Sequence, residues 1–448
     1  MMRCARMLLA TVAVGAATLS SPARAQEDTT GNRPPPGVRL GLNYGPGVKP
    51  GVIIFPIDET PGDSIRAILQ RDLDYSDRIN VIALNDSSLR ALVPAGGKPI
   101  NFPLVAKFGA ALLVRARPTA TGIHVTAYDV AAGGKVFEAA DFALPARSRN
   151  RNWRFAVHGI SDEIEKWILG KRGIAQSRIA YVSNGTLRLI DSDGAESRAV
   201  TAGRGALSPA WSPTGRSIVF SILGNTGTQI AELDLATGRT RRIARTPPGL
   251  NITPVFHPTG GSVVFAHGFG EGADLVLADP DSGGLRRLTV GRGSDNTSPT
   301  FNPDGRQIAF TSGRSGRPQV YIMDADGTNL QLLTEYDLGV RSYRTSPDWS
   351  PDGRAIAYQQ QNGDFQIWKV DLRDRIPRQL TSEGENEDPS WAPDGRHLVF
   401  ASTRGGTKQL WVLDTESGRF RQLTHDRGAR LAAWSPILGA AETTRTSQ

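Results

Sequence analysis

One phrase repeats through the second half of the chain and constrains its fold more than any other feature. Its pattern is x-Pro-x-aromatic-x-Pro-x-Gly, and full copies begin at Ser208, Thr253, Ser298, Ser346 and Asp388. A truncated sixth copy, Ala433-Trp434-Ser435-Pro436, lies near the C-terminus. The aromatic anchors are 42–48 residues apart, and a period of this length is typical of β-propeller blades.

Each repeat predicts four short strands. The aromatic residue ends the first strand, and the turn after it has a proline that presets φ and a glycine that closes the turn. In the fourth copy the second strand is 356–358, the third is 366–371, and the fourth ends with Arg378-Gln-Leu-Thr. Some third strands are apolar almost continuously, as 410–413 is. We expect such strands to be buried on both faces, as they are between packed blades.

The two ends of the repeat region are incomplete in complementary ways. Before the first full copy stand a second, a third and a fourth strand (179–182, 187–191 and 198–201), and after the last copy stands a lone first strand, 431–434. Together these fragments complete one blade. We therefore predict a β-propeller of six four-stranded blades over residues 178–436, closed by N- and C-terminal strands, with the terminal tryptophan buried. Ring closure removes the exposed sheet edges that promote aggregation.

The N-terminus is typical of an exported protein. Arg3 and Arg6 precede an uncharged apolar run, and Ala23-Arg24-Ala25 matches a small-x-small cleavage site. We therefore interpret residues 1–25 as a signal peptide. Residues 26–50, which are rich in proline and glycine, are expected to form a flexible N-terminal tail.

The segment between the tail and the propeller predicts a small α/β domain over residues 51–171. Its apolar patterns give the element order βαβαβββα. The expected strands are 52–57, 79–84, 110–115, 123–130 and 135–144, and the expected helices are 65–73, 103–108 and 153–168. Beyond the propeller, residues 437–448 are expected to form a disordered C-terminal tail.

Composition and motifs argue against catalysis and against binding to nucleic acid. The one cysteine, Cys4, rules out a disulfide framework and multi-cysteine zinc sites. A net charge of +8 over 448 residues is weak support for nucleic-acid binding. The sequence has neither a Gly-x-Ser-x-Gly elbow nor a phosphate-binding Gly-x-x-x-x-Gly-Lys-Ser/Thr loop, and its six histidines form no His-x-x-x-His pair. We expect no catalytic residue, no cofactor and no metal site, with the histidines structural or on the surface.

The aspartates of the Pro-Asp-Gly turns, Asp304, Asp352 and Asp394, invite comparison with calcium sites. They lie one per blade and so do not converge on one ion, and aspartate is a common turn residue. We interpret them as turn residues. A calcium ion at the mouth of the channel stays open as an alternative.

The variable loops before the inner strands are the expected recognition surface. They join one blade to the next and cluster around one end of the central channel, and loops on a rigid scaffold commonly carry recognition. Their asparagine, threonine, arginine and acidic side chains suit a protein partner. The residues expected to contact a partner are Leu250, Asn251, Thr253, Asn296, Thr297, Ser298, Arg344, Thr345, Asn386, Glu387 and Arg430.

Together these segments resemble the TolB family, the periplasmic propellers of the Tol–Pal system. The repeat pattern Ser-Pro-x-Trp-Ser-Pro-Asp-Gly-Arg-x-Ile-Ala-Phe carries the resemblance, and the signal peptide, the α/β domain, residues 153–171 and Arg178-Ile-Ala-Tyr-Val make it more specific. It covers nearly the whole chain after the signal peptide. The resemblance implies a periplasmic, monomeric, non-enzymatic scaffold that supports outer-membrane integrity and constriction at division.

The resemblance also implies two partners, with neither nucleic-acid binding nor insertion into a membrane. A peptidoglycan-associated lipoprotein, Pal, binds the channel mouth in this family, and the segments around Asn251 and 295–301 match that surface. An inner-membrane partner, TolA, engages the N-terminal tail, where Val38, Arg39, Leu40 and Leu42 resemble the family's tail strand. Two alternatives stay open: an enzyme acting on carbohydrate or peptide in the channel, and a sensor of a small ligand or calcium.

Overall fold

The computed structural model describes most of the chain after residue 47. The described residues are 48–57, 62–92, 99–146, 151–203, 205–243, 248–279, 284–291, 293–334, 342–425, 428–439 and 443–444. The predicted signal peptide, most of the predicted tail and its residues Val38, Arg39, Leu40 and Leu42 lie outside them. Residues 43–448 form one compact unit.

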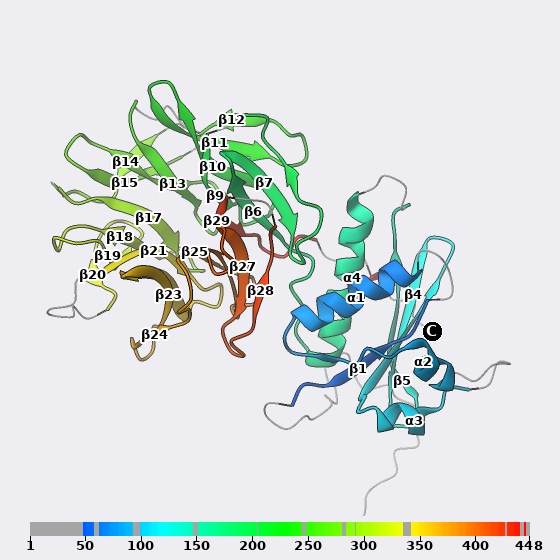
Figure 1. Ribbon diagram of the computed structural model, residues 1–448. Coiled ribbons are helices and arrows are strands. Elements are labelled where there is room, and N and C mark those ends of the chain that lie inside the picture. The colour runs from blue at the N-terminus through cyan, green and yellow to red at the C-terminus, as the bar shows by residue number, and fades with distance from the viewer. Residues whose placement is uncertain are drawn as a thin grey trace, which may run out of the picture. The chain divides into compact units, whose positions relative to one another are not determined.

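The N-terminal part of this unit is an α/β domain (Figure 1). Its strands are β1 (Gly51–Ile54), β2 (Asn80–Val81), β3 (Leu112–Pro118), β4 (Gly122–Asp129) and β5 (Lys135–Ala143). Its helices are α1 (Gly62–Tyr75), α2 (Asp86–Leu92), α3 (Phe102–Lys107) and α4 (Arg151–Leu169). The sheet order is β2-β1-β3-β4-β5, with β1 parallel to both of its neighbours and the other pairs antiparallel.

Two details of this domain differ from the expected order. The strand expected at 79–84 shortens to β2, and helix α2, which was not expected, follows it. Asn85 caps α2, because its Oδ1 accepts the N–H of Ser88 at 2.9 Å. Only Leu89 and Leu92 of α2 enter the core beside Ile53, so the helix is too short to show a 3.6-residue period in the sequence.

Helix α4 follows its predicted apolar face closely. Trp153, Val157, Ile160, Ile164 and Trp167 are all buried, and α4 packs on α1 and β5. The helix ends where Gly170 takes φ +73° and its N–H bonds to the carbonyl of Lys166, which is the usual role of glycine after a helix. Within the described part of the chain, α4 and the other helices are too short or too polar to cross a membrane.

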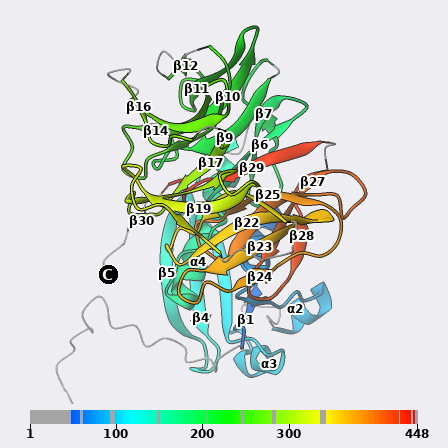
Figure 2. The same cartoon turned by 90° about the vertical axis from the view of Figure 1, so that its left-hand side faces the viewer.

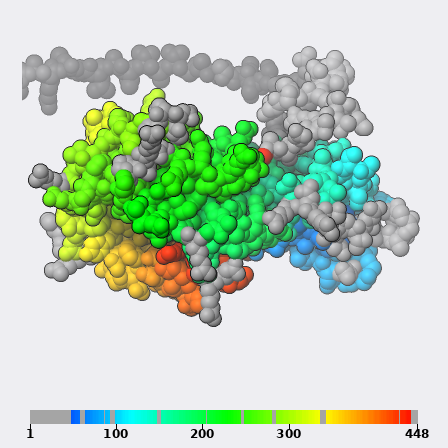
Figure 3. Space-filling model, turned by 90° about the horizontal axis from the view of Figure 1, so that it is seen from above, coloured from blue at the N-terminus to red at the C-terminus, as the bar shows by residue number. Residues whose placement is uncertain are grey.

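The second part is a β-propeller of six four-stranded sheets among the described residues, as predicted. From inner to outer strand, the first three blades are β9 (Ala206–Trp211), β10 (Ser217–Gly224), β11 (Gly227–Asp234), β12 (Thr240–Arg242); β13 (Asn251–Phe256), β14 (Val263–Gly268), β15 (Ala273–Ala278), β16 (Leu285–Arg287); and β17 (Asn296–Phe301), β18 (Gln307–Ser312), β19 (Gln319–Asp324), β20 (Gln331–Leu332). The next three are β21 (Tyr343–Trp349), β22 (Ala355–Asn362), β23 (Asp364–Asp371), β24 (Pro377–Gln379); β25 (Asn386–Trp391), β26 (His397–Ser402), β27 (Gln409–Asp414), β28 (Phe420–Gln422); and β29 (Ala429–Trp434), β6 (Arg178–Ser183), β7 (Thr186–Asp191), β8 (Arg198–Ala199). We number them blades 1 to 6, and in Figure 3 the colours run from green in blade 1 to orange in blade 5.

Every inner strand contains the same irregularity. Its register shifts opposite the second strand, and a non-glycine residue there takes a positive φ of 46–53°. These bulge residues are Ser208, Thr253, Ser298, Ser346, Asp388 and Leu431. A bulge removes its N–H from the strand ladder, and neighbouring side chains accept that N–H: Thr253 Oγ1 from Ser298 at 3.0 Å and Gln359 Oε1 from Asp388 at 2.7 Å.

The sixth blade closes the ring as the sequence predicts. Strand β29 pairs antiparallel with β6, and Trp434 lies opposite Ile179. The indole of Trp434 is 6% exposed, and its Nε1–H donates to Ser177 Oγ at 2.8 Å. Ser435 and Arg178 exchange two further hydrogen bonds of 2.9 Å. Residues about 250 positions apart are therefore joined at one seam.

Residues 437–439 and 443–444, which the structure describes, take defined positions, which corrects the expectation of a disordered tail for this part of 437–448. Ile437 packs against the core between blades 5 and 6 and Leu438 against the core between blades 6 and 1, and the Leu438 N–H donates to the Gln176 carbonyl at 3.0 Å. Strand β30 (Thr443–Thr444) then pairs with β5 at the edge of the α/β sheet (Figure 2). Pairing at a sheet edge uses backbone N–H and C=O groups, so the side-chain pattern of the sequence does not predict it.

Trp434→Ala is expected to lower the free energy of unfolding by about 3–5 kcal/mol, because it leaves a cavity at the closing seam. Urea denaturation followed by circular dichroism measures the loss. Leu223→Ala is the control, because Leu223 is 61% exposed and its replacement leaves the core intact. A Trp434→Ala protein as stable as the control contradicts a seam that depends on this side chain.

Candidate functional site: the propeller channel and its mouth

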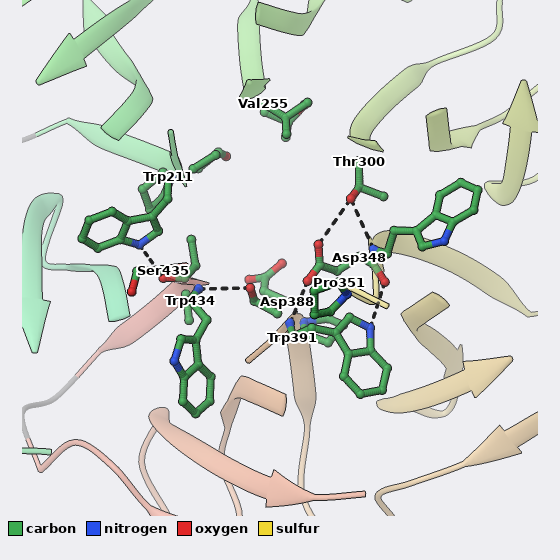
Figure 4. A pocket seen from close by; sticks show the side chains of 18 of the residues that line it. Trp211, Val255, Thr300, Asp348, Pro351, Asp388, Trp391, Trp434 and Ser435 are labelled. Carbon is green, nitrogen blue, oxygen red and sulfur yellow. Dashed lines mark hydrogen bonds between the residues drawn. The ribbon is translucent and has the colours of Figure 1, made fainter. Parts of the chain in front are cut away.

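The inner strands enclose a channel with a cavity volume of about 480 Å³. The residue just before the aromatic anchor of each inner strand lines it, as does the bulge residue two positions earlier. The first set is Ala210, Val255, Thr300, Asp348, Ser390 and Ala433. Within this set the polar residues Thr300, Asp348 and Ser390 come from consecutive blades, and Ala210, Val255 and Ala433 are apolar. Figure 4 shows Thr300 and Asp348 beside each other in the wall.

The polar channel residues hold neighbouring blades together. Thr300 Oγ1 accepts the backbone N–H of Trp349 in the next blade at 3.2 Å. Asp348 Oδ2 accepts the N–H of Trp391 at 2.7 Å, and Ser390 Oγ accepts that of Trp434 at 3.1 Å. Three successive contacts between blades thus contain the same kind of hydrogen bond, from a tryptophan backbone N–H to a channel side chain. These side chains therefore serve mainly to hold neighbouring blades together.

Two carboxyl groups in the channel wall have a raised pKa. Burial raises the pKa of Asp348 to about 6, although the hydrogen bonds from Trp391 and Thr300 act against the shift. Burial also raises the pKa of Asp388 to about 6, and the neighbouring charge of Glu387 adds to the shift. Desolvation therefore dominates over the local donors at both positions.

A second polar layer lies at the mouth, where the inner strands begin. Asn251 Nδ2 donates to the Thr228 carbonyl at 2.7 Å, Asn296 Nδ2 to Asp274 Oδ1 at 2.8 Å, and Asn386 Nδ2 to Gln366 Oε1 at 2.8 Å. Arg344 Nε donates to Gln360 Oε1 at 3.0 Å. Each asparagine links the start of an inner strand to the third strand of the preceding blade.

The four side chains of this layer are buried in the chain by itself. Asn251, Asn296 and Asn386 are fully buried, and Arg344 is 4% exposed. Polar residues in loops commonly lie on the surface, but these four satisfy buried backbone and side-chain groups. They position the mouth, and a direct contact between them and a partner stays a prediction.

The other predicted mouth residues keep part of their surface. Leu250 is 44% exposed, Arg430 is exposed, and Thr253, Thr297, Ser298, Thr345 and Glu387 are half-buried. Glu387 pairs with Lys408. The structure thus leaves a ring of partly accessible side chains at the mouth, of which Thr253 and Ser298 also line the channel, and their role in binding stays a prediction.

Sequence reasoning missed two apolar residues near this ring. Leu223 and Phe269 lie in the hairpins between the second and third strands of blades 1 and 2, and they are 61% and 44% exposed. The N–H of Gly268, next to Phe269, bonds to the Leu250 carbonyl at 2.8 Å, so the hairpin and the mouth loop are adjacent. Arg287 stacks on Phe269 at 4.0 Å. The sequence signal that could have indicated these two residues is an apolar side chain next to the glycines of a hairpin turn.

Comparison with known proteins places this geometry in context. A family profile described as the TolB β-propeller domain matches residues 165–438. The chain is similar to the Tol-Pal system protein TolB of Gluconobacter oxydans (strain 621H), with 31% identity over 190 residues, 40% of this chain and 39% of that protein. It is similar to the protein of the same name from Legionella pneumophila (strain Corby), with 29% identity over 207 residues, 43% of this chain and 46% of that protein.

These alignments span less than half the length of the curated relatives. A solved structure extends the likeness beyond them. TolB from Acinetobacter baumannii matches with a TM-score of 0.75 and 27% sequence identity, covering 87% of this chain and 97% of that chain. The similarity therefore includes the α/β domain as well as the propeller.

Asp348→Asn is expected to flatten the pH dependence of stability. A carboxyl whose pKa is raised on folding, here from 3.8 to about 6, binds its proton more tightly in the folded state, so stability falls as pH rises between these values. The asparagine still accepts the Trp391 N–H. Urea unfolding at pH 4 and pH 7 compares the variant with wild type, and Asp304→Asn, at an exposed turn, is the control. An unchanged pH dependence in Asp348→Asn contradicts the assignment.

Proposed function

The chain belongs to the TolB β-propeller family, and from this premise we propose that it is a periplasmic, non-enzymatic scaffold of a Tol–Pal-like system. In this proposal the mouth of the propeller channel binds a Pal-like, peptidoglycan-associated lipoprotein. The N-terminal tail, which lies outside the described residues, engages a TolA-like inner-membrane protein through Val38, Arg39, Leu40 and Leu42. The link between envelope layers supports outer-membrane integrity and constriction at division.

The main support for the mouth as the binding surface is that it combines a rigid base with an accessible apolar edge. The buried Asn251 and Asn296 hold the loops in place. Leu250, Phe269 and Leu223 lie near these loops with 44–61% of their surface exposed. Protein interfaces draw most of their affinity from a few apolar or aromatic anchors set in a polar rim. Thr297, Ser298 and Arg430 supply such a rim.

The channel wall supports a scaffold more than an enzyme. Catalysis in the channel requires titratable groups that are free to act on a substrate. Asp348 is engaged by Trp391 and Thr300, and its neighbour Ser390 holds Trp434. These polar side chains therefore serve the ring itself, and the accessible chemistry lies outside, on the rim.

Leu250→Glu is expected to weaken binding of the Pal-like lipoprotein from the same organism at least about tenfold, because it places a charge in the apolar centre of the interface. Isothermal titration calorimetry with the soluble domain of that lipoprotein measures the dissociation constant. The matched control is Leu285→Glu, since Leu285 belongs to the outer strand of the same blade and is 41% exposed. The control is expected to bind as wild type does.

Two outcomes contradict this proposal. If both leucine variants bind the lipoprotein as wild type does, the rim of blade 2 is not the interface. If wild type shows no affinity for the lipoprotein, the partner assignment fails. Asn296→Ala tests the buried layer of the mouth. It is expected to lower stability, since it removes the buried Nδ2 donor that bonds to Asp274 Oδ1 and to the Ala273 carbonyl.

A further inference from the structure

The α/β domain contacts the propeller through charged side chains, some of them buried and others at the exposed edge of the contact. Near the C-terminal end of α1, Asp74 and Asp77 accept hydrogen bonds of 2.7 and 3.1 Å from Arg419, which precedes β28. Arg78 reaches Asp394, in the turn before β26, at 3.4 Å. Burying charges is costly unless each is paired, so the pairing at this contact decides how firmly the two parts hold together.

One histidine from the propeller lies between carboxylates of both parts. His397, the first residue of β26, is fully buried. Its Nδ1 is 2.8 Å from Asp394 Oδ2 in its own blade, and its Nε2 is 3.4 Å from Asp77 Oδ2 in the α/β domain. A neutral imidazole has one N–H and one lone pair, so it can donate to only one of these carboxylates and repels the other.

A second histidine, from the α/β domain, also lies between carboxylates of both parts. His158 of α4 is fully buried, and its Nδ1 is 2.7 Å from Asp72 Oδ2 of α1. Its Nε2 faces two propeller carboxylates, Asp191 Oδ2 at 3.9 Å and Asp193 Oδ2 at 4.0 Å. Nε2 and Asp191 Oδ2 have no hydrogen-bond partner within the described residues. Only the imidazolium is attracted to all three carboxylates.

We propose that His397 and His158 are a pair of protonated latches that hold the α/β domain on the propeller at acidic and neutral pH and weaken that contact in alkaline solution. His397 belongs to the propeller and faces a carboxylate of the α/β domain, and His158 belongs to the α/β domain and faces two carboxylates of the propeller. The proposal rests on the placement of both ring nitrogens against carboxylates. It goes beyond the scaffold function and does not depend on the identity of any partner.

The charged groups around each latch agree with this assignment. Beside His397, the hydrogen bonds and charges of Asp394 and Asp77 outweigh burial and raise its pKa above 6.5, while Arg421 acts against the shift. Asp414, paired with Arg396, and Glu165, paired with Arg78, also face this cluster. Burial raises the pKa of Glu165 to about 8, against the opposing charge of Arg78, so Glu165 adds little negative charge to the cluster at pH 7.

Beside His158, the nearby carboxylates likewise outweigh burial. Asp72, Asp193 and Asp191 raise the pKa of His158 above 6.5. Arg71 and Arg154 pair with Asp193, and Arg178 pairs with Asp191. A histidine whose pKa is raised on folding stabilises the protein fully below 6.5, and this stabilisation is lost as pH rises through the folded value. Both latches therefore act in the same direction.

A divalent cation is a poorer occupant of the His158 cluster than a proton. Aspartate and histidine are common metal ligands, and Asp72, His158 and Asp193 bring ligand atoms within 4.8 Å of one another. However, Arg71 and Arg154 already bind Asp193, so an added ion meets two guanidinium groups at close range. Metal binding is therefore an outcome that the test must be able to reveal.

The repeat itself supplies matched variants. The position of His397 is Ser217, Ser262, Gln307 and Ala355 in blades 1 to 4, so the blade geometry accepts small or amide side chains there. His397→Gln copies the residue of blade 3. Asp352→Asn is the control for charge removal, because Asp352 occupies in blade 4 the turn position that Asp394 occupies in blade 5 and is exposed.

The test uses the full chain and two measurements. Carbon-13 and proton NMR of labelled histidine gives the pKa of each imidazole, and both latches are expected above 6.5. Urea unfolding from pH 6 to pH 9.5 gives stability, and each linked proton changes the unfolding equilibrium up to about tenfold per pH unit. Wild type and Asp352→Asn are expected to lose stability more steeply above pH 7 than His397→Gln and His158→Gln do.

Three results overturn the proposal. The first is a neutral imidazole at pH 6.5 for both His397 and His158. The second is a pH dependence of His397→Gln and His158→Gln that matches wild type. The third is a rise in melting temperature on adding zinc chloride after chelator treatment, if His158→Gln or His397→Gln abolishes it, because that result assigns the cluster to a metal.

Discussion

The pairing of β29 with β6 is the constraint on which the rest of the propeller depends. Strands about 250 residues apart in the sequence must meet before the sixth blade exists, and the buried Trp434 indole, bonded to Ser177, seals that seam. Once the ring is closed, each inner strand has a neighbour on both sides. Three neighbouring pairs of blades are joined by the same kind of hydrogen bond. In each, the backbone N–H of a tryptophan donates to a side chain of the preceding blade: Trp349 to Thr300, Trp391 to Asp348 and Trp434 to Ser390.

This closure divides the polar residues of the inner strands between two tasks. Those that point into the channel or lie at the start of the strand, such as Asp348 and Asn296, bond to neighbouring blades. Others, such as Thr297 and Arg430, keep an accessible surface. A rigid inner layer beneath an accessible outer one is the arrangement expected of a scaffold that binds a partner without reorganising, because little conformational entropy is lost on binding.

The contact between the α/β domain and the propeller follows a different principle. It relies on paired charges, with His397 and His158 placed among carboxylates and several arginines at the periphery. Apolar burial changes little with pH, whereas buried charge pairs hold only while both members stay ionised. The propeller and its contact with the α/β domain therefore differ in the pH range that affects them: the channel carboxyl of Asp348 responds between pH 3.8 and about 6, and the histidines of the interdomain contact respond above pH 6.5.

The sequence by itself determined the number of blades, the strand order within them and the closing seam, because the aromatic anchors and turns recur at a fixed period and each copy carries the same local signals. It also indicated the α/β domain, but not helix α2, whose seven residues are too few to show a period. Tertiary structure alone decided which polar residues are accessible: Asn251 and Leu250 are neighbours in one loop, yet one is fully buried and the other is 44% exposed. It also decided the charge pairs across the two parts, since His397 and Asp77 are 320 residues apart. Burial and long-range pairing depend on what the folded chain brings alongside a residue, and no local pattern encodes that.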